Sequence, residues 1–198
     1  MSESIFHSFE LVLASKSPRR RQLLSQLGFG IQYVDINVDE SKHEPVSPEL
    51  TAETLALLKA KAFPAEKLGP NQILVTADTV VVHNNQVLGK PKDRTEAFSM
   101  LTSLSGDCNH VYTGVCLKHA DLIHSFTEKS DVFFRPLQEW EINYYLDNYD
   151  YLDKAGSYGI QEWIGMIGVS RIEGCYYNVM GLPLTHLYEE LLHLILKS

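Results

Sequence analysis

The chain has 198 residues and a formal net charge of −8, with 44% hydrophobic and 21% charged residues. This length suits one domain, with or without two lobes, and allows a sizeable core. The acidic charge argues against broad nucleic-acid binding, which needs a basic surface, and three scattered cysteines exclude a disulfide framework. The first ten residues lack the apolar stretch of a signal peptide, and no run reaches membrane-spanning length. We therefore expect a single cytoplasmic domain, residues 1–198, with no nucleic-acid or membrane partner.

The first predicted elements are a short buried strand from Leu11, a tight turn, and a helix that begins at Pro18. Ser17 is a favourable N-cap, and Pro18 suits the first helical position. Three arginines follow at residues 19–21, in a turn where the helix dipole is positive and acidic residues are preferred. A helix N-terminus can hold an anion. The pattern fits a bound phosphate chain and solvent-exposed arginines about equally well.

The middle of the chain predicts alternating strands and helices, with turns that contain proline, glycine or asparagine. The apolar run at 73–82 is typical of a strand buried on both faces. A capping-box pattern begins at Asp93. We expect strands at 31–36, 73–82 and 87–88, helices at 49–63 and 93–104, and a hairpin turn at 83–86.

Asp78 interrupts the apolar run at 73–82. An unpaired carboxylate in such a strand is destabilising by several kcal/mol or becomes neutral. It therefore needs a cation, a metal or hydrogen-bond donors. We favour a functional role over a bond to nearby backbone, because nothing else in the run is charged.

The second half of the chain predicts a meander followed by helices and a hairpin. We expect strands at 111–117, 122–127 and 129–134, a helix at 136–146, a glycine-rich loop at 153–161, a hairpin of strands at 169–172 and 175–180, and a final amphipathic helix at 184–196. Two cysteines and two histidines near the first of these strands do not match zinc-ligand spacing, so we assign them core and surface roles: Cys108, His110, Cys116 and His119.

The chain lacks a Walker-type loop, a G-x-G-x-x-G turn and a G-x-S-x-G elbow. It does carry cations and acids near the ends of apolar segments. Such groups suit metal-assisted attack on a phosphoanhydride, in which cations offset charge and carboxylates hold a divalent metal and activate water. Ordinary solvated charge is the alternative for each lysine and for Glu40. The candidates are Arg19, Arg20, Lys59, Lys90, Asp78 and Glu40.

A set of short motifs, in order along nearly the whole chain, resembles the Maf family of nucleotide pyrophosphatases. They are L-A-S-x-S-P-R-R-x-x-L-L at 13–24, A-D-T-V-V at 77–81, G-K-P at 89–91, L-S-G at 104–106, D-K-A-G-S-Y-G-I-Q at 153–161 and G-L-P at 181–183. The resemblance implies an α/β fold with a bent mixed β-sheet flanked by helices, related to inosine triphosphate pyrophosphatases. It also implies two lobes with a central cleft and a homodimer.

The same resemblance implies hydrolysis of a nucleoside triphosphate to the monophosphate and pyrophosphate with Mg²⁺ or Mn²⁺. It makes Asp78 the proton acceptor and a metal ligand together with Glu40. Phosphate binding falls to Ser15, Arg20, Lys59 and Lys90. Three positions resemble the branch that acts on dTTP and UTP: Arg19, Thr79 and Gln161. Arg21 is interpreted as a solvated side chain on the helix face.

Two alternatives stay open at this level. A non-catalytic nucleotide-binding regulator of cell division could use the same residues, although two acids beside phosphates favour an enzyme. Within the enzyme class, the substrates could be modified pyrimidine nucleotides rather than dTTP and UTP.

Overall fold

The computed structural model describes residues 6–39 and 46–197. The strands form a seven-stranded sheet with the order β2-β1-β3-β5-β6-β7, and β4 pairs with β3. Their bounds are β1 (Glu10–Ala14), β2 (Gly30–Val34), β3 (Gln72–His83), β4 (Gln86–Leu88), β5 (Cys108–His119), β6 (Leu122–Phe134) and β7 (Val169–Glu173). β1 runs parallel to both β2 and β3, whereas β4 and β7 are antiparallel to their partners. The predicted α/β class with a mixed sheet is therefore confirmed. In the described part of the chain, none of the helices has the length and apolar character needed to cross a bilayer.

The chain divides into two compact units, which we describe separately. The first consists of the chain up to Asp78, Thr113–Glu128 and the chain from Gly181 onward. The second consists of Thr79–Tyr112 and Lys129–Met180. The strands β3, β5 and β6 contribute residues to both units.

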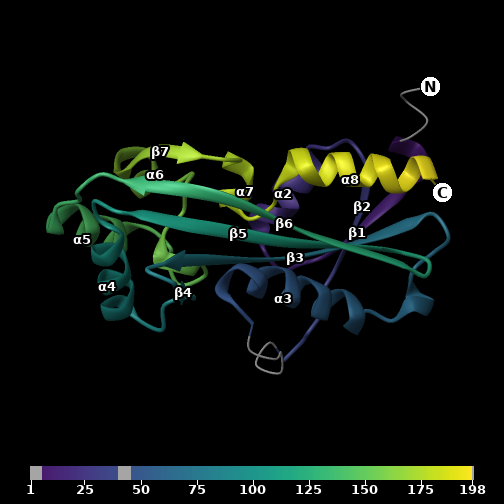
Figure 1. The fold of residues 1–198 in the computed structure, drawn as a ribbon, viewed down its shortest axis with the longest axis horizontal. Coiled ribbons are helices and arrows are strands. Elements are labelled where there is room, and N and C mark those ends of the chain that lie inside the picture. The colour runs from purple at the N-terminus through teal and green to yellow at the C-terminus, as the bar shows by residue number, and fades with distance from the viewer. Residues whose placement is uncertain (1–5, 40–45, 198) are drawn as a thin grey trace. The chain divides into compact units, whose positions relative to one another are not determined.

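The first unit contains the strand–turn–helix of residues 10–25 (Figure 1). Its elements are β1 (Glu10–Ala14), α2 (Pro18–Ser25), β2 (Gly30–Val34), α3 (Pro48–Ala62), a 3-10 turn (Ala65–Lys67), α8 (Leu184–Lys197) and parts of β3 (Gln72–His83), β5 (Cys108–His119) and β6 (Leu122–Phe134). Figure 1 shows α3 and α8 on opposite sides of the strands of this unit.

Small residues allow α3 to lie close to the sheet. Ala56 and Ala60 are fully buried and belong to one cluster with Val12, Leu74 and Cys116. On β5, Gly114 faces the helix so closely that an added Cβ would lie 2.2 Å from the backbone nitrogen of Glu53. No side chain fits there, so α3 packs directly against the strand backbone.

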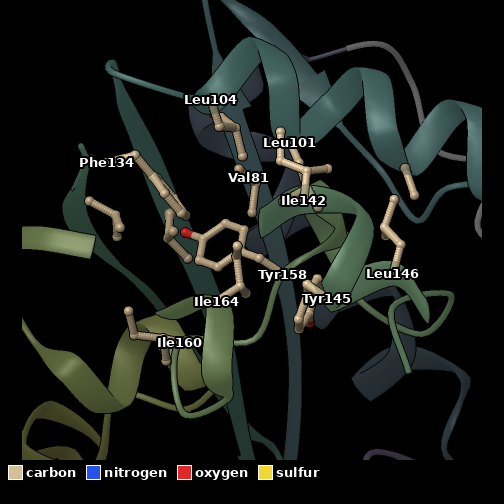
Figure 2. Close-up of a cluster of buried hydrophobic side chains, with 13 residues drawn as sticks. Val81, Leu101, Leu104, Phe134, Ile142, Tyr145, Leu146, Tyr158, Ile160 and Ile164 are labelled. Carbon is tan, nitrogen blue, oxygen red and sulfur yellow. The ribbon is translucent and has the colours of Figure 1, made fainter. Parts of the chain in front are cut away.

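The second unit contains the remaining helices. Its elements are β4 (Gln86–Leu88), α4 (Arg94–Leu104), α5 (Glu139–Asn148), a 3-10 turn (Ala155–Ser157), α6 (Trp163–Gly168), β7 (Val169–Glu173), α7 (Tyr176–Met180) and the other parts of β3, β5 and β6. Figure 2 shows its core, where Tyr158 lies among side chains from β3, α4, α5 and α6. The rings of Tyr158 and Phe134 pack edge to face, with their centroids 5.1 Å apart. The hydroxyl of Tyr158 donates to Oδ1 of Asn109 at 2.9 Å.

Two predictions about strands are wrong. The strands expected at 122–127 and 129–134 are one strand, β6, because its side chains keep alternating between exposed and buried through Lys129, Ser130 and Asp131. The second strand of the expected hairpin is the helix α7. The amide of Asn178 is buried there and donates to the Val111 carbonyl at 3.1 Å. This long-range contact overrides the β-propensity of the neighbouring Tyr and Val residues. The helix α6 was not predicted.

The start of α5 depends on one ion pair. The guanidinium of Arg135 donates to both carboxylate oxygens of Glu141, at 3.0 and 2.6 Å, and one of these oxygens accepts from the backbone nitrogen of Gln138. The hydrogen bonds from Arg135 are the main cause that lowers the pKa of Glu141. A lowered carboxyl pKa stabilises the fold above the unfolded pKa, and this contribution is lost as pH falls through the folded pKa.

We therefore expect Glu141→Gln to lower the free energy of unfolding at pH 7 by about 2 kcal/mol. Below pH ~4.3, the ordinary glutamate pKa, the wild type should lose this advantage, so the two melting curves should approach each other. Thermal unfolding at several pH values measures both the loss of stability at pH 7 and the smaller difference at low pH. A difference in melting temperature that stays the same at pH 7 and pH 3 would contradict the role of the charge.

Candidate functional site

The turn between β1 and α2 is held by two serines. The backbone nitrogen of Ser17 donates to Oγ of Ser15 at 3.2 Å, and the nitrogen of Arg20 donates to Oγ of Ser17 at 3.4 Å. Ser17 is the N-cap of α2, Pro18 is its first residue, and its first turn holds no acidic residue. The predicted helix start is confirmed. The first turn therefore carries backbone N–H groups and arginines without a carboxylate, an arrangement that suits an anion.

The end of β1 lies beside the segment of β3 that carries Asp78. Leu13 is opposite Val75 in the parallel pairing, so the last residue of β1, Ala14, is level with Thr76. Asp78 follows two residues later in β3. The turn to α2 thus begins next to Asp78, and the carboxyl ends of parallel strands are a common place for ligand sites.

Asp78 was predicted to need a cation, a metal or hydrogen-bond donors, and the structure places the cation Lys59 beside it. Its Nζ atom lies 2.5 Å from Oδ1 of Asp78, and both side chains are only 16% exposed. The two residues are 19 positions apart and come from α3 and β3. The pair gives the carboxylate a charge-assisted hydrogen bond in a setting where an unpaired carboxylate would be costly.

The three arginines of α2 have different surroundings. Nε of Arg20 donates to the carbonyl of Gly181 at 2.8 Å, which ties α2 to the segment before α8. Arg19 is half-buried. Arg21 was expected to be solvated, but its Nε donates to the Ser15 carbonyl at 3.0 Å, and a terminal nitrogen contacts Asp35 at 3.2 Å. Arg21 therefore holds the turn in place, a role that its position on the helix does not reveal.

In the second unit, the loop that carries Lys90 is joined to the glycine-rich segment. The carbonyl of Gly89 accepts from the nitrogen of Gly156 at 3.1 Å. Gly156 has a φ of 68°, which favours glycine, and an added Cβ would lie 3.2 Å from Val81. Lys90 itself is exposed, and Gln161 is half-buried at the other end of the segment.

A buried lysine, which sequence reasoning missed, organises this segment. The ammonium of Lys154 is 5% exposed and contacts the carboxylates of Asp153 at 2.8 Å and Glu162 at 3.1 Å, and it also donates to the Asp150 carbonyl. The hydroxyl of Tyr145 donates to Glu162 and accepts from the nitrogen of Gly159 at 3.2 Å. The only sequence signal for a role of Lys154 was its presence in the motif at 153–161.

Burial, followed by the hydrogen bond to Glu162, raises the pKa of Tyr145 far above its usual range. Tyr145 therefore remains a neutral donor at any physiological pH. Its bonds to Glu162 and Gly159 lie on either side of Gln161 in the chain and constrain the turn that carries this residue.

The structure thus brings together Lys59 and Asp78, and it places Ser15 in the turn beside β3 and Arg20 in the first turn of α2. Thr79 follows Asp78 in β3 and belongs, like Lys90 and Gln161, to the second unit. Glu40 lies outside the described residues. In the part of the chain that is described, no three Asp, Glu, His or Cys side chains are arranged to hold a metal ion.

Comparison with known proteins identifies the family. The model of the family described as Maf-like protein matches residues 10–194. The chain belongs to the Maf-like protein family. The resemblance expected from the short motifs is confirmed, and the matched region includes every described candidate residue.

Curated relatives cover almost the whole chain. A protein of Bacteroides fragilis named dTTP/UTP pyrophosphatase is 47% identical over 92% of this chain and 95% of its own length. Proteins with the same name from Cytophaga hutchinsonii and Christiangramia forsetii are 43% and 41% identical, over 93% and 96% of this chain and 84% and 97% of their own. Among solved structures, the Ham1 protein of Staphylococcus aureus superposes with a TM-score of 0.50 at 15% identity, over 91% of this chain and 98% of that chain, and supports the fold.

Proposed function

We propose that this protein hydrolyses dTTP and UTP to the corresponding monophosphate and pyrophosphate. The observation that carries the chemistry is the Lys59–Asp78 pair, which lies beside the end of β1 where the arginine-bearing helix begins. The choice of substrate rests on the relatives named dTTP/UTP pyrophosphatase at 41–47% identity. The names of these relatives favour a pyrimidine triphosphate over other nucleotides.

In this proposal, Asp78 accepts a proton from a water molecule. The water oxygen forms a bond to the α-phosphorus, and the bond from that phosphorus to the oxygen bridging to the β-phosphorus breaks. Pyrophosphate leaves with the bonding electrons. Because Lys59 contacts Oδ1, we assign the water to Oδ2 of Asp78. Lys59, Arg20 and Lys90 offset the charge that develops on the leaving group.

A divalent metal fits the donor chemistry of this region. Mg²⁺ is usually held by one or two carboxylates together with substrate phosphates rather than by a full protein cage. Asp78 offers one such carboxylate on a largely apolar strand, and Glu40 is the second residue that we assign to the metal. Bound there, Mg²⁺ or Mn²⁺ would polarise the phosphate and offset its charge.

The remaining candidates divide by role. Ser15 belongs with the phosphate-binding residues, because the turn that it holds exposes the start of α2. Arg19, Thr79 and Gln161 are assigned to the pyrimidine base, whose edge an amide and a hydroxyl can match, whereas purines leave polar groups unpaired. A cytoplasmic location, a homodimer and the lack of nucleic-acid or membrane partners complete the proposal.

A substrate panel tests the proposal. With Mg²⁺ or Mn²⁺, pyrophosphate release from dTTP and UTP should exceed that from ATP and GTP by about 100-fold in kcat/KM. Equal rates with all four nucleotides would contradict the pyrimidine preference. Tight dTTP binding without turnover would instead support a nucleotide-binding regulator. Adding 5-methyl-UTP and pseudo-UTP shows whether modified pyrimidines are preferred.

A further inference from the structure

The helix α3, which carries Lys59, is attached to the sheet by polar contacts as well as by apolar packing. The two carboxylate oxygens of Glu53 accept from the hydroxyls of Ser125 and Thr127 on β6, each at 2.7 Å. At the other end of the helix, the buried ammonium of Lys118 on β5 donates to the carbonyl of Phe63 at 3.1 Å. Phe63 is the C-cap of α3, so the helix is held in its second turn and at its C-terminal end.

A third contact lies between these two and next to the candidate catalytic pair. Oγ1 of Thr76 donates to the carbonyl of Ala56 at 2.7 Å, and both residues are fully buried. Thr76 precedes Asp78 by two positions in β3, so the two side chains share a face of the strand. Ala56 precedes Lys59 by three positions in α3. The hydrogen bond and the ion pair therefore join the same two elements, one turn apart.

The apolar contacts of α3 are not sufficient by themselves to set the position of the helix along the sheet. Around Ala56 and Ala60 they are small and non-directional, and Gly114 offers flat backbone rather than a side chain. The long stem of Lys59 is flexible and would follow Asp78 over a range of helix positions. The hydrogen bond from Thr76 is directional and fixes the helix at the turn before Lys59, between the contacts of Glu53 and Lys118.

We propose that Thr76 is a positioning residue, whose hydroxyl holds α3 so that the ammonium of Lys59 meets Asp78. Thr76 is fully buried, and its hydrogen bond goes to the backbone of α3. The positioning role therefore belongs to the hydroxyl of Thr76 rather than to its methyl group. The expected effect of Thr76 on catalysis rests on the function proposed above. The expected effect of Thr76 on the Lys59–Asp78 pair is independent of that function.

The test compares Thr76→Val, which keeps the shape but removes the donor, with Thr76→Ser, which keeps the donor. In steady-state hydrolysis of dTTP, T76V should lower kcat about 10-fold with KM changed less than about twofold, and T76S should stay within about twofold of the wild type. The matched control is Thr51→Val in the first turn of α3, whose hydroxyl bonds the Ser47 carbonyl at an exposed site. T51V should leave kcat unchanged.

A stability measurement tests the same inference without turnover. If Thr76 aligns the pair, T76V should destabilise the wild type more than it destabilises the variant Asp78→Asn. The factor by which T76V raises the unfolding constant in urea should be about threefold larger in the wild-type background than in the D78N background. Wild-type kcat in T76V, equal losses in T76V and T76S, or strictly additive effects with D78N would each overturn the proposal. A wild-type protein inactive on every nucleotide would refute the proposed function alone, because the coupling in urea would still report on Thr76.

Discussion

Replacing Asp78 by asparagine should reduce kcat for dTTP about 1,000-fold, because the variant keeps the shape of the side chain but cannot accept a proton. The same change leaves the ammonium of Lys59 in a site where it is 16% exposed and without its carboxylate. We therefore also expect a loss of about 2 kcal/mol in the free energy of unfolding. Pyrophosphate release and urea unfolding measure the two effects.

The control for this variant is Asp147→Asn. Asp147 contacts Arg94 at 2.7 Å on the surface of the second unit, where both side chains are about half exposed. Breaking this exposed pair should change neither kcat nor stability measurably. If D78N hydrolysed dTTP at the wild-type rate, Asp78 would not be the proton acceptor. A variant that is inactive because it is unfolded is recognised by its lost melting transition. Adding Lys59→Met to D78N then tests whether removing the buried cation restores the fold.

Replacing Lys154 by methionine should have the largest effect on stability. It removes a 5% exposed ammonium from between Asp153 and Glu162 and leaves the Glu162 carboxylate, which is 20% exposed, with Tyr145 as its remaining partner. We expect a loss of about 3 kcal/mol and a melting temperature lower by about 6–12 °C for a chain of this length. Because Gln161 precedes Glu162, KM for dTTP should also rise.

Differential scanning calorimetry of three variants checks this prediction. Lys129→Met is the matched control, because Lys129 contacts Asp131 at 3.0 Å but is exposed. It should shift the melting temperature by at most about 2 °C. Adding Glu162→Gln to the Lys154→Met variant should restore part of the stability, since the carboxylate is then neutral. A double variant less stable than Lys154→Met would show that charge is not the cause.

Elements that depend on neighbouring residues were predictable from the sequence. The serine N-cap and proline at the start of α2 act within one turn, and the asparagine turn before β4 needs only the positive φ that Asn84 and Asn85 adopt. The final helix, predicted at 184–196, extends over Leu184–Lys197. At the start of α4, Asp93 is the N-cap as predicted, and its Oδ1 accepts from the backbone nitrogen of Glu96.

Predictions failed where a distant partner decides the conformation. The segment Tyr176–Met180 has β-prone residues but is helical, because Asn178 bonds Val111 and Ser130, 67 and 48 positions away. Arg21 was interpreted as a solvated side chain on the helix face. Its guanidinium lies over the ring of Tyr33 on β2, which becomes a neighbour only when β1 and β2 pair.

By itself, the sequence determined the family, through motifs spread along the chain, and the need for a cation, a metal or hydrogen-bond donors beside Asp78, because a lone carboxylate in an apolar strand is unstable. It could not say which of these three is present. Tertiary structure decided that Lys59 is the partner and that Thr76 and Lys154 support the candidate residues. The physical reason is that strand order and helix register bring Lys59 to Asp78, 19 positions away, and Thr76 to Ala56, 20 positions away, and local periodicity does not encode either.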